Sequence, residues 1–290
     1  MLRKVFMSVL CAVMVLSLTA CVMEFDNAGS MLSKALQEYK ESVELGDKYK
    51  GGESIELNLD MQVAKAVIDS TEDKLADVRF SYNSKALKPE FVVEDDEISI
   101  SNKLSGNSFG KPVNIWDVKL SDKVPMEVAL KADASDVKLD MSGMLISSVD
   151  AALNASTAKI YFDEPNKELL DKFKLDADAS SASIYGAGNI GYETLDIDAN
   201  ASMIMVDLTG NNERDGEVRI DANASTIKLK LPENVGAKII IDKYDISSVK
   251  LNNSDVLSSS DKEYVTKDYG KTESTLKIYA DLNVTTLTIE

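Results

Sequence analysis

The sequence has 290 residues, with 32 Lys or Arg against 49 Asp or Glu, and its formal net charge at pH 7 is −17. This balance argues against nucleic acid as a partner, because phosphate contacts need clustered basic side chains. The chain has no histidine, which removes the commonest general base and the commonest transition-metal ligand.

The N-terminus has the pattern of an export signal. Arg3 and Lys4 precede the apolar run "VFMSVLCAVMVLSL", which "LTAC" ends. This pattern predicts a signal peptide over residues 1–20. The residues "LTAC" resemble the lipobox of bacterial lipoproteins, which implies that the thiol of Cys21 carries diacylglycerol and that Cys21 is the first mature residue. The alternative is an ordinary signal peptide with a chance cysteine.

Processing at Cys21 has consequences for charge, cross-linking and location. Loss of two basic residues gives a mature net charge of −17 − 2 = −19. The only other cysteine, Cys11, lies within the signal, so the mature chain is held together by its core without a disulfide. We expect residues 21–40 to be a tether. The lipid would anchor the protein to a bacterial membrane facing outside the cytoplasm, the outer membrane if the host has one.

Strand-like alternation of apolar and polar residues dominates after the tether, so the fold class predicted is all-β. Residues 41–125 contain the strand patterns "DVRFSY", "PEFVVE" and "EISIS". We expect them to form an N-terminal β module that caps one end of a repeat domain over residues 126–290.

A near-duplicated decapeptide indicates the repeat. Residues 197–206 read "IDANASMIMV" and residues 220–229 read "IDANASTIKL". Small or apolar residues fall on even positions up to Ala224 and on odd positions afterwards, a shift that predicts a bend with Ala201 and Ala224 inside and Ser225 outside. Alanine would then be required because stacked corners leave no room for larger groups.

The same shift occurs eight times, and an Asp or Asn stands before each bend. These side chains can bond the backbone two residues on and tolerate positive φ. From residue 134 to residue 246 the bends recur about every 22 residues, which predicts a single-stranded β-helix, or β-solenoid, with parallel pairing of adjacent coils. The expected structural corners are Asp60, Asp133, Asn154, Asp178, Asn200, Asn223, Asp245 and Asn283.

Residues 252–275 lack apolar alternation and interrupt the repeat. We interpret them as an excursion from the last corner, partly ordered by Tyr264 and Tyr269, which are our candidate binding residues. The last strand pair, "LKIYADLNVTTLTIE", would then return to close the stack.

Trp116, Asp117, Leu120, Val124 and Pro125, within "NIWDVKLSDKVPMEVAL", resemble the toast-rack family of bacterial cell-envelope proteins. That family is similar to the C-terminal domains of cell-wall antibiotic-response regulators and to adhesin-like single-stranded β-helices. The resemblance runs from about residue 41 to residue 290. It implies a β-solenoid outside the cytoplasmic membrane and supplies no catalytic residues. The family usually has glycine at the corners, where this chain has Asp or Asn followed by Ala.

Carboxylates are the side chains of this chain that could form a catalytic or metal site. Some β-helices cleave acidic polysaccharides, but the carboxylates of "EDDE" (residues 94–97) and of the "DAD" and "DID" tracts are typical of solvated strand faces. Calcium could bind stacked carboxylates at Asp133, Asp178 and Asp245, yet Asn fills the other corners. We therefore expect no catalytic residue, no metal and no cofactor.

The function predicted is that of a non-catalytic, lipid-anchored surface protein that presents a β-solenoid face for adhesion or envelope scaffolding. The alternative is an accessory or sensory component of a cell-envelope stress response, and an enzyme acting on polysaccharides is the least favoured. The expected partners are the membrane, through Cys21, and an unidentified envelope or extracellular component.

Overall fold

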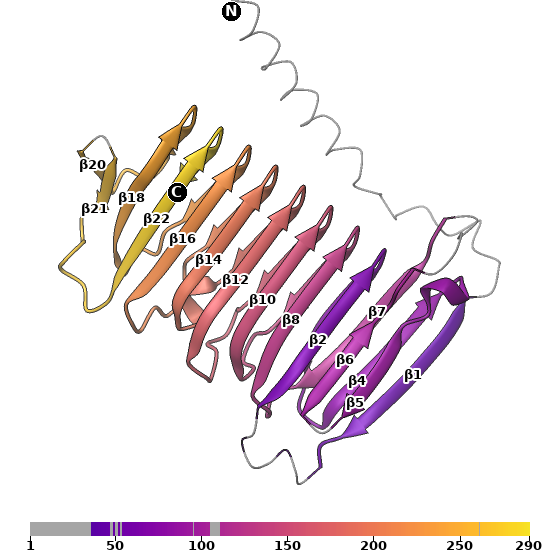
Figure 1. Cartoon of the computed structure of the whole chain (residues 1–290). Helices are drawn as coiled ribbons and strands as arrows, with labels where there is room; N and C mark the ends of the chain where they lie inside the picture. The colour runs from indigo at the N-terminus through magenta and orange to yellow at the C-terminus, as the bar shows by residue number, and fades with distance from the viewer. Residues whose placement is uncertain are drawn as a thin grey trace, which may run out of the picture. The chain divides into compact units, whose positions relative to one another are not determined.

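The computed structural model describes residues 36–46, 49, 52, 54–94, 96–104, 111–260 and 262–290. Gln37–Glu290 forms one compact unit (Figure 1). Its strands form two sheets, and its named helical elements are the short 3-10 helices η3 (Lys85–Leu87) and η4 (Ala187–Asn189). The prediction of an all-β chain is confirmed.

Sheet A and sheet B are named here by their strands in spatial order. Sheet A contains β1 (Gln37–Glu44), β4 (Lys74–Tyr82), β7 (Asn114–Ser121), β3 (Lys65–Thr71), β9 (Asp136–Asp140), β11 (Thr157–Tyr161), β13 (Ser181–Tyr185), β15 (Met203–Asp207), β17 (Thr226–Lys230), β23 (Thr286–Ile289) and β19 (Ser248–Leu251). Sheet B contains β20 (Val256–Ser260), β21 (Glu263–Thr266), β18 (Gly236–Asp245), β22 (Thr275–Asn283), β16 (Gly216–Asn223), β14 (Tyr192–Asn200), β12 (Leu170–Asp178), β10 (Ile146–Asn154), β8 (Met126–Asp133), β2 (Ile55–Gln62), β6 (Glu97–Ser101) and β5 (Glu90–Glu94).

The repeating unit is one strand of sheet B, a corner, and a shorter strand of sheet A. The equivalent strands of neighbouring units pair in parallel, as expected. Ile197 of β14, for example, lies beside Ile220 of β16. Alternate side chains of both sheets point inward and belong to one buried apolar cluster. The outward positions of both sheets are therefore left for polar contacts.

The C-terminal strand pair does not occupy the end of the stack. β22 pairs in parallel with β16 on one side and with β18 on the other, and β23 lies likewise between β17 and β19. Figure 1 shows the yellow β22 between β16 and β18. The expectation that this pair closes the stack is wrong, because the end unit is β18–β19, whose β18 also pairs with the hairpin β20–β21.

Strands of the N-terminal part pair directly with strands of the repeats. β2 and β3 pair with β8 and β9, across the boundary expected at residues 125 and 126. β6 and β7 lie on the far side of β2 and β3, so the expected module and the repeats share both sheets. β1 begins at Gln37, inside the segment expected to be a tether. The expected signal peptide and Cys21 lie outside the described residues.

Aromatic side chains close the N-terminal end of the core. Trp116 is fully buried, and its ring meets that of Phe80 edge-on with 5.6 Å between centroids. Tyr39 of β1 stacks on the other side of Phe80 at 5.9 Å. The indole N–H of Trp116 donates to Asn114 Oδ1 at 2.9 Å, so burial leaves no indole donor unpaired.

Candidate functional site

Each corner contains a non-glycine residue with positive φ. Ala201 and Ala224 have φ of 51°, directly after Asn200 and Asn223. The N–H of Ala201 donates to the carbonyl of Asn223 in the next unit at 2.9 Å. The structure places the other expected corner residues, Asp133, Asn154, Asp178, Asp245 and Asn283, directly before residues in the same conformation.

Asp60 is an exception, and its assignment as a corner is wrong. The residue with positive φ in that unit is Val63, and the position before it is Gln62, which lies in register with Asp133. Asp60 lies two residues earlier, beside Lys131. The other corners have an Asp or Asn before the bend, whereas this unit has Gln there.

The expected orientation of the corner side chains is also wrong. Ala222 and Ser225 are buried, whereas Ala224 is exposed and Ala201 is only partly buried. The left-handed turn at Ala224 makes two successive residues, Asn223 and Ala224, point outward. The shift of three therefore falls between Ala222 and Ser225, two residues earlier than the alternation suggested.

The buried corner hydroxyls form a continuous ladder. The N–H of Ser202 donates to Ser225 Oγ at 3.0 Å, and the N–H of Ser180 donates to Ser202 Oγ at the same distance. The hydroxyl of Ser225 in turn donates to backbone carbonyls, including that of Ala199 at 3.0 Å. The ladder satisfies buried backbone groups at each bend. Its members are the buried Ser135, Ser156, Ser180, Ser202, Ser225 and Thr285, and the partly buried Ser247 at the end.

The outward corner side chains form a second row in which no two Asp residues are adjacent. Asp178 lies between Asn154 and Asn200, and Asp133 lies between Gln62 and Asn154. The amide of Asn154 donates to Asp133 Oδ1 at 3.3 Å. Within the described residues, no group of three Asp, Glu, Cys or His side chains is placed to hold a metal ion.

Carboxylates come together two residues before this row, on the outer face of sheet B. Asp176, Asp198, Asp221 and Asp281 occupy the same register position on the adjacent strands β12, β14, β16 and β22. We call these four residues the aspartate row. Adjacent strands lie about 4.8 Å apart, so neighbouring like charges repel each other.

Electrostatics within the aspartate row are uneven. Partial burial, together with the charges of Asp176 and Asp221, raises the pKa of Asp198 above its usual value. Lys174 Nζ lies 2.6 Å from Asp176 Oδ2, and this hydrogen bond raises the pKa of the lysine. Lys243 pairs with Asp281 at the other end. The middle of the row is therefore its least neutralised part.

A groove of about 500 Å³ lies over the middle of the aspartate row. Lys174, Arg219 and Tyr279 also line it. Oδ1 of Asp196, a further lining residue, is buried without a hydrogen-bond partner. The carboxylates that line the groove are Asp196, Asp198, Glu217, Asp221, Asp242 and Asp281.

Sequence reasoning interpreted these carboxylates as a solvated strand face and did not find the groove. The signal was present in the shared position of Asp in "LDAD", "IDAN", "IDAN" and "ADLN". What the sequence concealed is that "ADLN", near the C-terminus, lies directly beside the second "IDAN".

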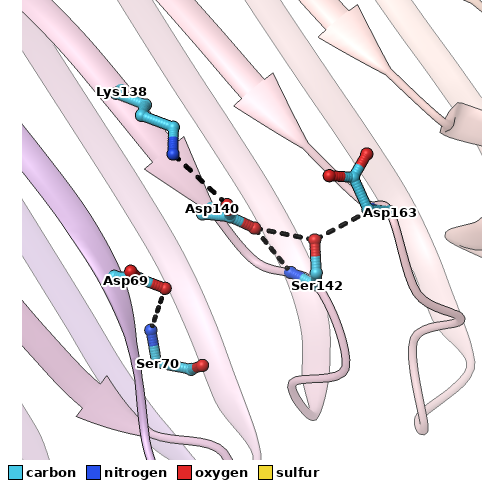
Figure 2. A network of polar contacts seen from close by, with 6 residues as sticks. All are labelled: Asp69, Ser70, Lys138, Asp140, Ser142 and Asp163. Carbon is cyan, nitrogen blue, oxygen red and sulfur yellow. Dashed lines mark hydrogen bonds and ion pairs between the residues drawn. The ribbon is translucent and has the colours of Figure 1, made fainter.

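A further polar cluster, on sheet A, is structural (Figure 2). Ser142 Oγ donates to Asp140 Oδ1 at 2.7 Å and accepts from the N–H of Asp163 at 2.8 Å. Asp140 Oδ2 also lies 3.5 Å from Lys138 Nζ. Both oxygens of Asp140 are thus used to hold the end of β9, and Figure 2 shows Asp69 in a separate contact with Ser70.

The two candidate tyrosines have different surroundings. Tyr264 lies on β21, is partly buried and packs against the apolar core. Tyr269 lies in the turn after β21, where its N–H donates to Thr266 O at 3.1 Å. Its Cα would lie 2.6 Å from a Cβ added at Gly236, so this close approach requires glycine at position 236.

In the part of the chain that the structure describes, no helix has the length and apolar character needed to span a membrane. The model of a protein family described as the N-terminal domain of toast_rack, DUF2154, matches residues 32–177, which is half of the chain. No curated protein matches the chain.

Solved structures with a similar chain path come from bacteria. A "putative cell adhesion protein" from Clostridium sporogenes is 21% identical, with 88% of this chain and 99% of that chain covered and a TM-score of 0.45. A "putative adhesin" from Bacteroides fragilis is 11% identical, with 89% and 98% covered and a TM-score of 0.44. At these scores the likeness carries no functional argument.

Proposed function

Starting from the fact that the chain belongs to the toast-rack family, we propose that it is a non-catalytic bacterial surface protein, lipid-anchored through Cys21, that binds its partner with the outer face of sheet B. We interpret the stacked two-strand units as the coils of a β-solenoid, because such a fold would present a long, regular face to a partner. Adhesion or scaffolding of the envelope is the role that this surface serves.

The observation that carries the proposal is the groove over the aspartate row. Six carboxylates against two cationic side chains make it strongly negative. The raised pKa of Asp198 reflects partial burial and the charges of Asp176 and Asp221. Asp196 pairs with Lys172 through Oδ2 at 2.8 Å, but its Oδ1 has no hydrogen-bond partner among the described residues. A cationic group entering the groove would relieve the repulsion and supply donors. The partner is therefore an extended polymer or protein segment that carries repeated positive charges.

Binding of a fluorescent oligolysine peptide to the full-length protein in detergent tests the surface. The double substitution D198N/D221N should weaken binding roughly tenfold, equivalent to about 1.4 kcal/mol. The matched control is D117N/D136N, which removes the same charge from the outer face of sheet A and should leave affinity nearly unchanged. Equal losses in both variants would reduce the effect to net charge and overturn the site.

Anchoring is tested on the expected lipid attachment residue. Cys21→Ser should abolish labelling by a palmitate analogue and move the protein from the membrane to the soluble fraction, because stable anchoring requires the acyl chains. Labelling that persists in this variant would contradict the lipoprotein assignment.

The non-catalytic part of the proposal rests on the absence of histidine from the sequence. It also rests on the lysine partners that hold both ends of the aspartate row. Purified protein should release no product from peptidoglycan or acidic polysaccharide. Reproducible turnover that one carboxylate substitution abolishes would refute it.

A further inference from the structure

The two sheets end unevenly at the unit β18–β19. Sheet A stops at β19, whereas sheet B continues past β18 with β21 and β20. With strands about 4.8 Å apart, the hairpin extends sheet B by roughly 10 Å beyond the last strand of sheet A. Tyr264 of this hairpin packs against the same core as Val249 of β19.

The last corner lacks the hydrogen bonds that the earlier corners make. The N–H of Ala224 donates to Asn283 O at 2.9 Å, and the N–H of Ser225 donates to Thr285 Oγ1 at 3.4 Å. The equivalent donors of the end unit are the N–H groups of Ile246 and Ser247. Neither has a hydrogen-bond partner among the described residues.

The backbone of β19 also has one unused side. Ser248 N–H donates to Thr285 O and Asn252 N–H donates to Ile289 O, so the even-numbered residues bond β23. Because backbone groups alternate along a strand, Val249 and Leu251 direct their N–H and C=O groups away from β23. Among the described residues β19 is the last strand of sheet A, so these groups face an open edge there.

Inward side chains of β19 are uncovered compared with those of earlier units. Leu229 and Ile289, which precede Leu251 in its register row, are 0% exposed, whereas Leu251 is 38% exposed. Val249 is only partly buried, whereas Ile227 and Leu287 in its register row are 0% exposed. The core is thus open at the sheet A side of this end.

At the opposite end of the stack, the corner backbone is capped by a side chain. The side-chain amide of Asn102 donates to Gln62 O at 2.8 Å, and Asn102 Oδ1 accepts from Gln62 N at 3.0 Å, so a side chain replaces the missing neighbour. The edge strand β1 carries charges in "QEYKESVE", which discourage pairing. The open edge at β19 is therefore not a general property of the stack ends.

We propose that the free edge of β19 binds an extended segment of a partner polypeptide, which adds one strand to sheet A above the hairpin overhang. This surface is separate from the groove on sheet B. Main-chain bonds to Val249 and Leu251 would supply affinity, and apolar side chains over Leu251 would supply specificity, as in other cases of strand addition.

The overhang argues for a single segment over a second whole copy. Two-fold pairing of β19 with itself would continue both sheets across the contact. The hairpins of both copies would then have to occupy one strand spacing between the two β18 strands. One extended strand has no second sheet and meets no such obstacle.

The chain itself provides a probe of matching chemistry. Its residues 280–290, "ADLNVTTLTIE", already accept from the corner donors of Ala224 and Ser225 through Asn283 O and Thr285 Oγ1. A fluorescent peptide of this sequence should therefore bind the full-length protein in detergent. Val249→Pro removes a donor only from the open edge and should weaken binding at least tenfold. Lys250→Ala, which alters an outward side chain of the same strand, should have no effect.

A backbone-methylated pair of peptides makes the test independent of how well Val249→Pro folds. In the protein, Thr286 and Glu290 direct their N–H groups to β17. Because backbone groups alternate, the N–H of Thr288 points to the same side and the N–H of Leu287 to the opposite side. In the bound peptide, the Thr288 side would face β19. N-methylation at Thr288 should abolish binding, and N-methylation at Leu287 should not. Equal binding of both peptides, or a dimer of the full-length protein that Val249→Pro dissolves, would overturn the proposal.

Discussion

The N–H of Ser202 donates a hydrogen bond to the hydroxyl of Ser225, 3.0 Å away in the next unit. Ser225 is 5% exposed, and its hydroxyl donates onward to Ala199 O at 3.0 Å. Regular strand pairing would not satisfy these groups, because the corner residues lie between the two sheets and outside the hydrogen bonding of either. The corner hydroxyls therefore connect the units where the strands cannot.

Loss of this hydroxyl should be costly. Ser225→Ala leaves the N–H of Ser202 buried and unpaired, and we expect it to lower the free energy of unfolding by about 1–3 kcal/mol. Ser225→Thr is the control, because Thr285 fills the equivalent position in its own unit with the hydroxyl in the ladder. Urea denaturation measures both, and equal stability of the Ala variant and the parent would contradict the ladder's role.

Relief of the left-handed corner should stabilise the protein. Ala224 is exposed with φ of 51°, a conformation that costs L-residues about 1–2 kcal/mol and glycine almost nothing. Ala224→Gly should raise the free energy of unfolding by about 1 kcal/mol. Ala222→Gly, within buried strand backbone, should lower it by a similar amount. If both variants lose stability in thermal denaturation, the corner conformation is not as described.

Replacing Asn102 with aspartate should destabilise the protein. In Asn102→Asp the donor to Gln62 O becomes an acceptor, and a buried carboxylate would face a carbonyl oxygen. We expect a loss of roughly 1–3 kcal/mol at neutral pH. Asn223→Asp, flanked by the amides of Asn200 and Asn283, is the tolerated control. Thermal denaturation at neutral pH compares the two, and the same effect for both would argue against a capping role.

The end unit should depend on the inserted C-terminal strands. Leu287 is fully buried, and Leu287→Ala should cost about 2–5 kcal/mol. Because β18 and β19 reach the earlier units through β22 and β23, amide exchange should accelerate in both pairs together. Val249→Ala, at the open edge, should leave β22 and β23 protected. Exchange confined to β23 in the Leu287 variant would show that the two units open independently.

The aspartate row should make stability depend on pH. The folded-state pKa of Asp198 is raised by partial burial first and by Asp176 and Asp221 next. Its contribution to stability is therefore present below its ordinary pKa of 3.8 and lost as pH rises through the higher folded value. Asp198→Asn should raise the melting temperature at pH 7, and this gain should vanish in acid.

Asp215 supplies the control of opposite sign. Its pKa is lowered because the N–H and hydroxyl of Thr275 donate to it, so its contribution is present above pH 3.8 and lost as pH falls through the lower folded value. Asp215→Asn should therefore lower the melting temperature at pH 7. A gain in both variants at pH 7 would indicate a general effect of net charge.

The sequence by itself determined the all-β class, the parallel pairing of adjacent units and the position of most bends. Each of these follows from local rules: alternation places one side of a strand inward, and an Asp or Asn precedes a tight turn. Asp60 was misassigned because the rule was applied to residue type, whereas the bend after Gln62 is held by contacts with Asp133 of β8 and with Asn102, which follows β6.

Only the tertiary structure decided which corner residues are buried and in what order the units stack. Alternation cannot show that a left-handed residue makes two successive side chains, Asn223 and Ala224, point outward. The prediction therefore placed Ala224 inside and Ser225 outside, the reverse of what the structure shows. The place of β22 between β16 and β18 depends on long-range pairing that no local pattern encodes. The same insertion brings Asp281 beside Asp221 and leaves β19 at an open edge, because strands distant in sequence compete for the same neighbours.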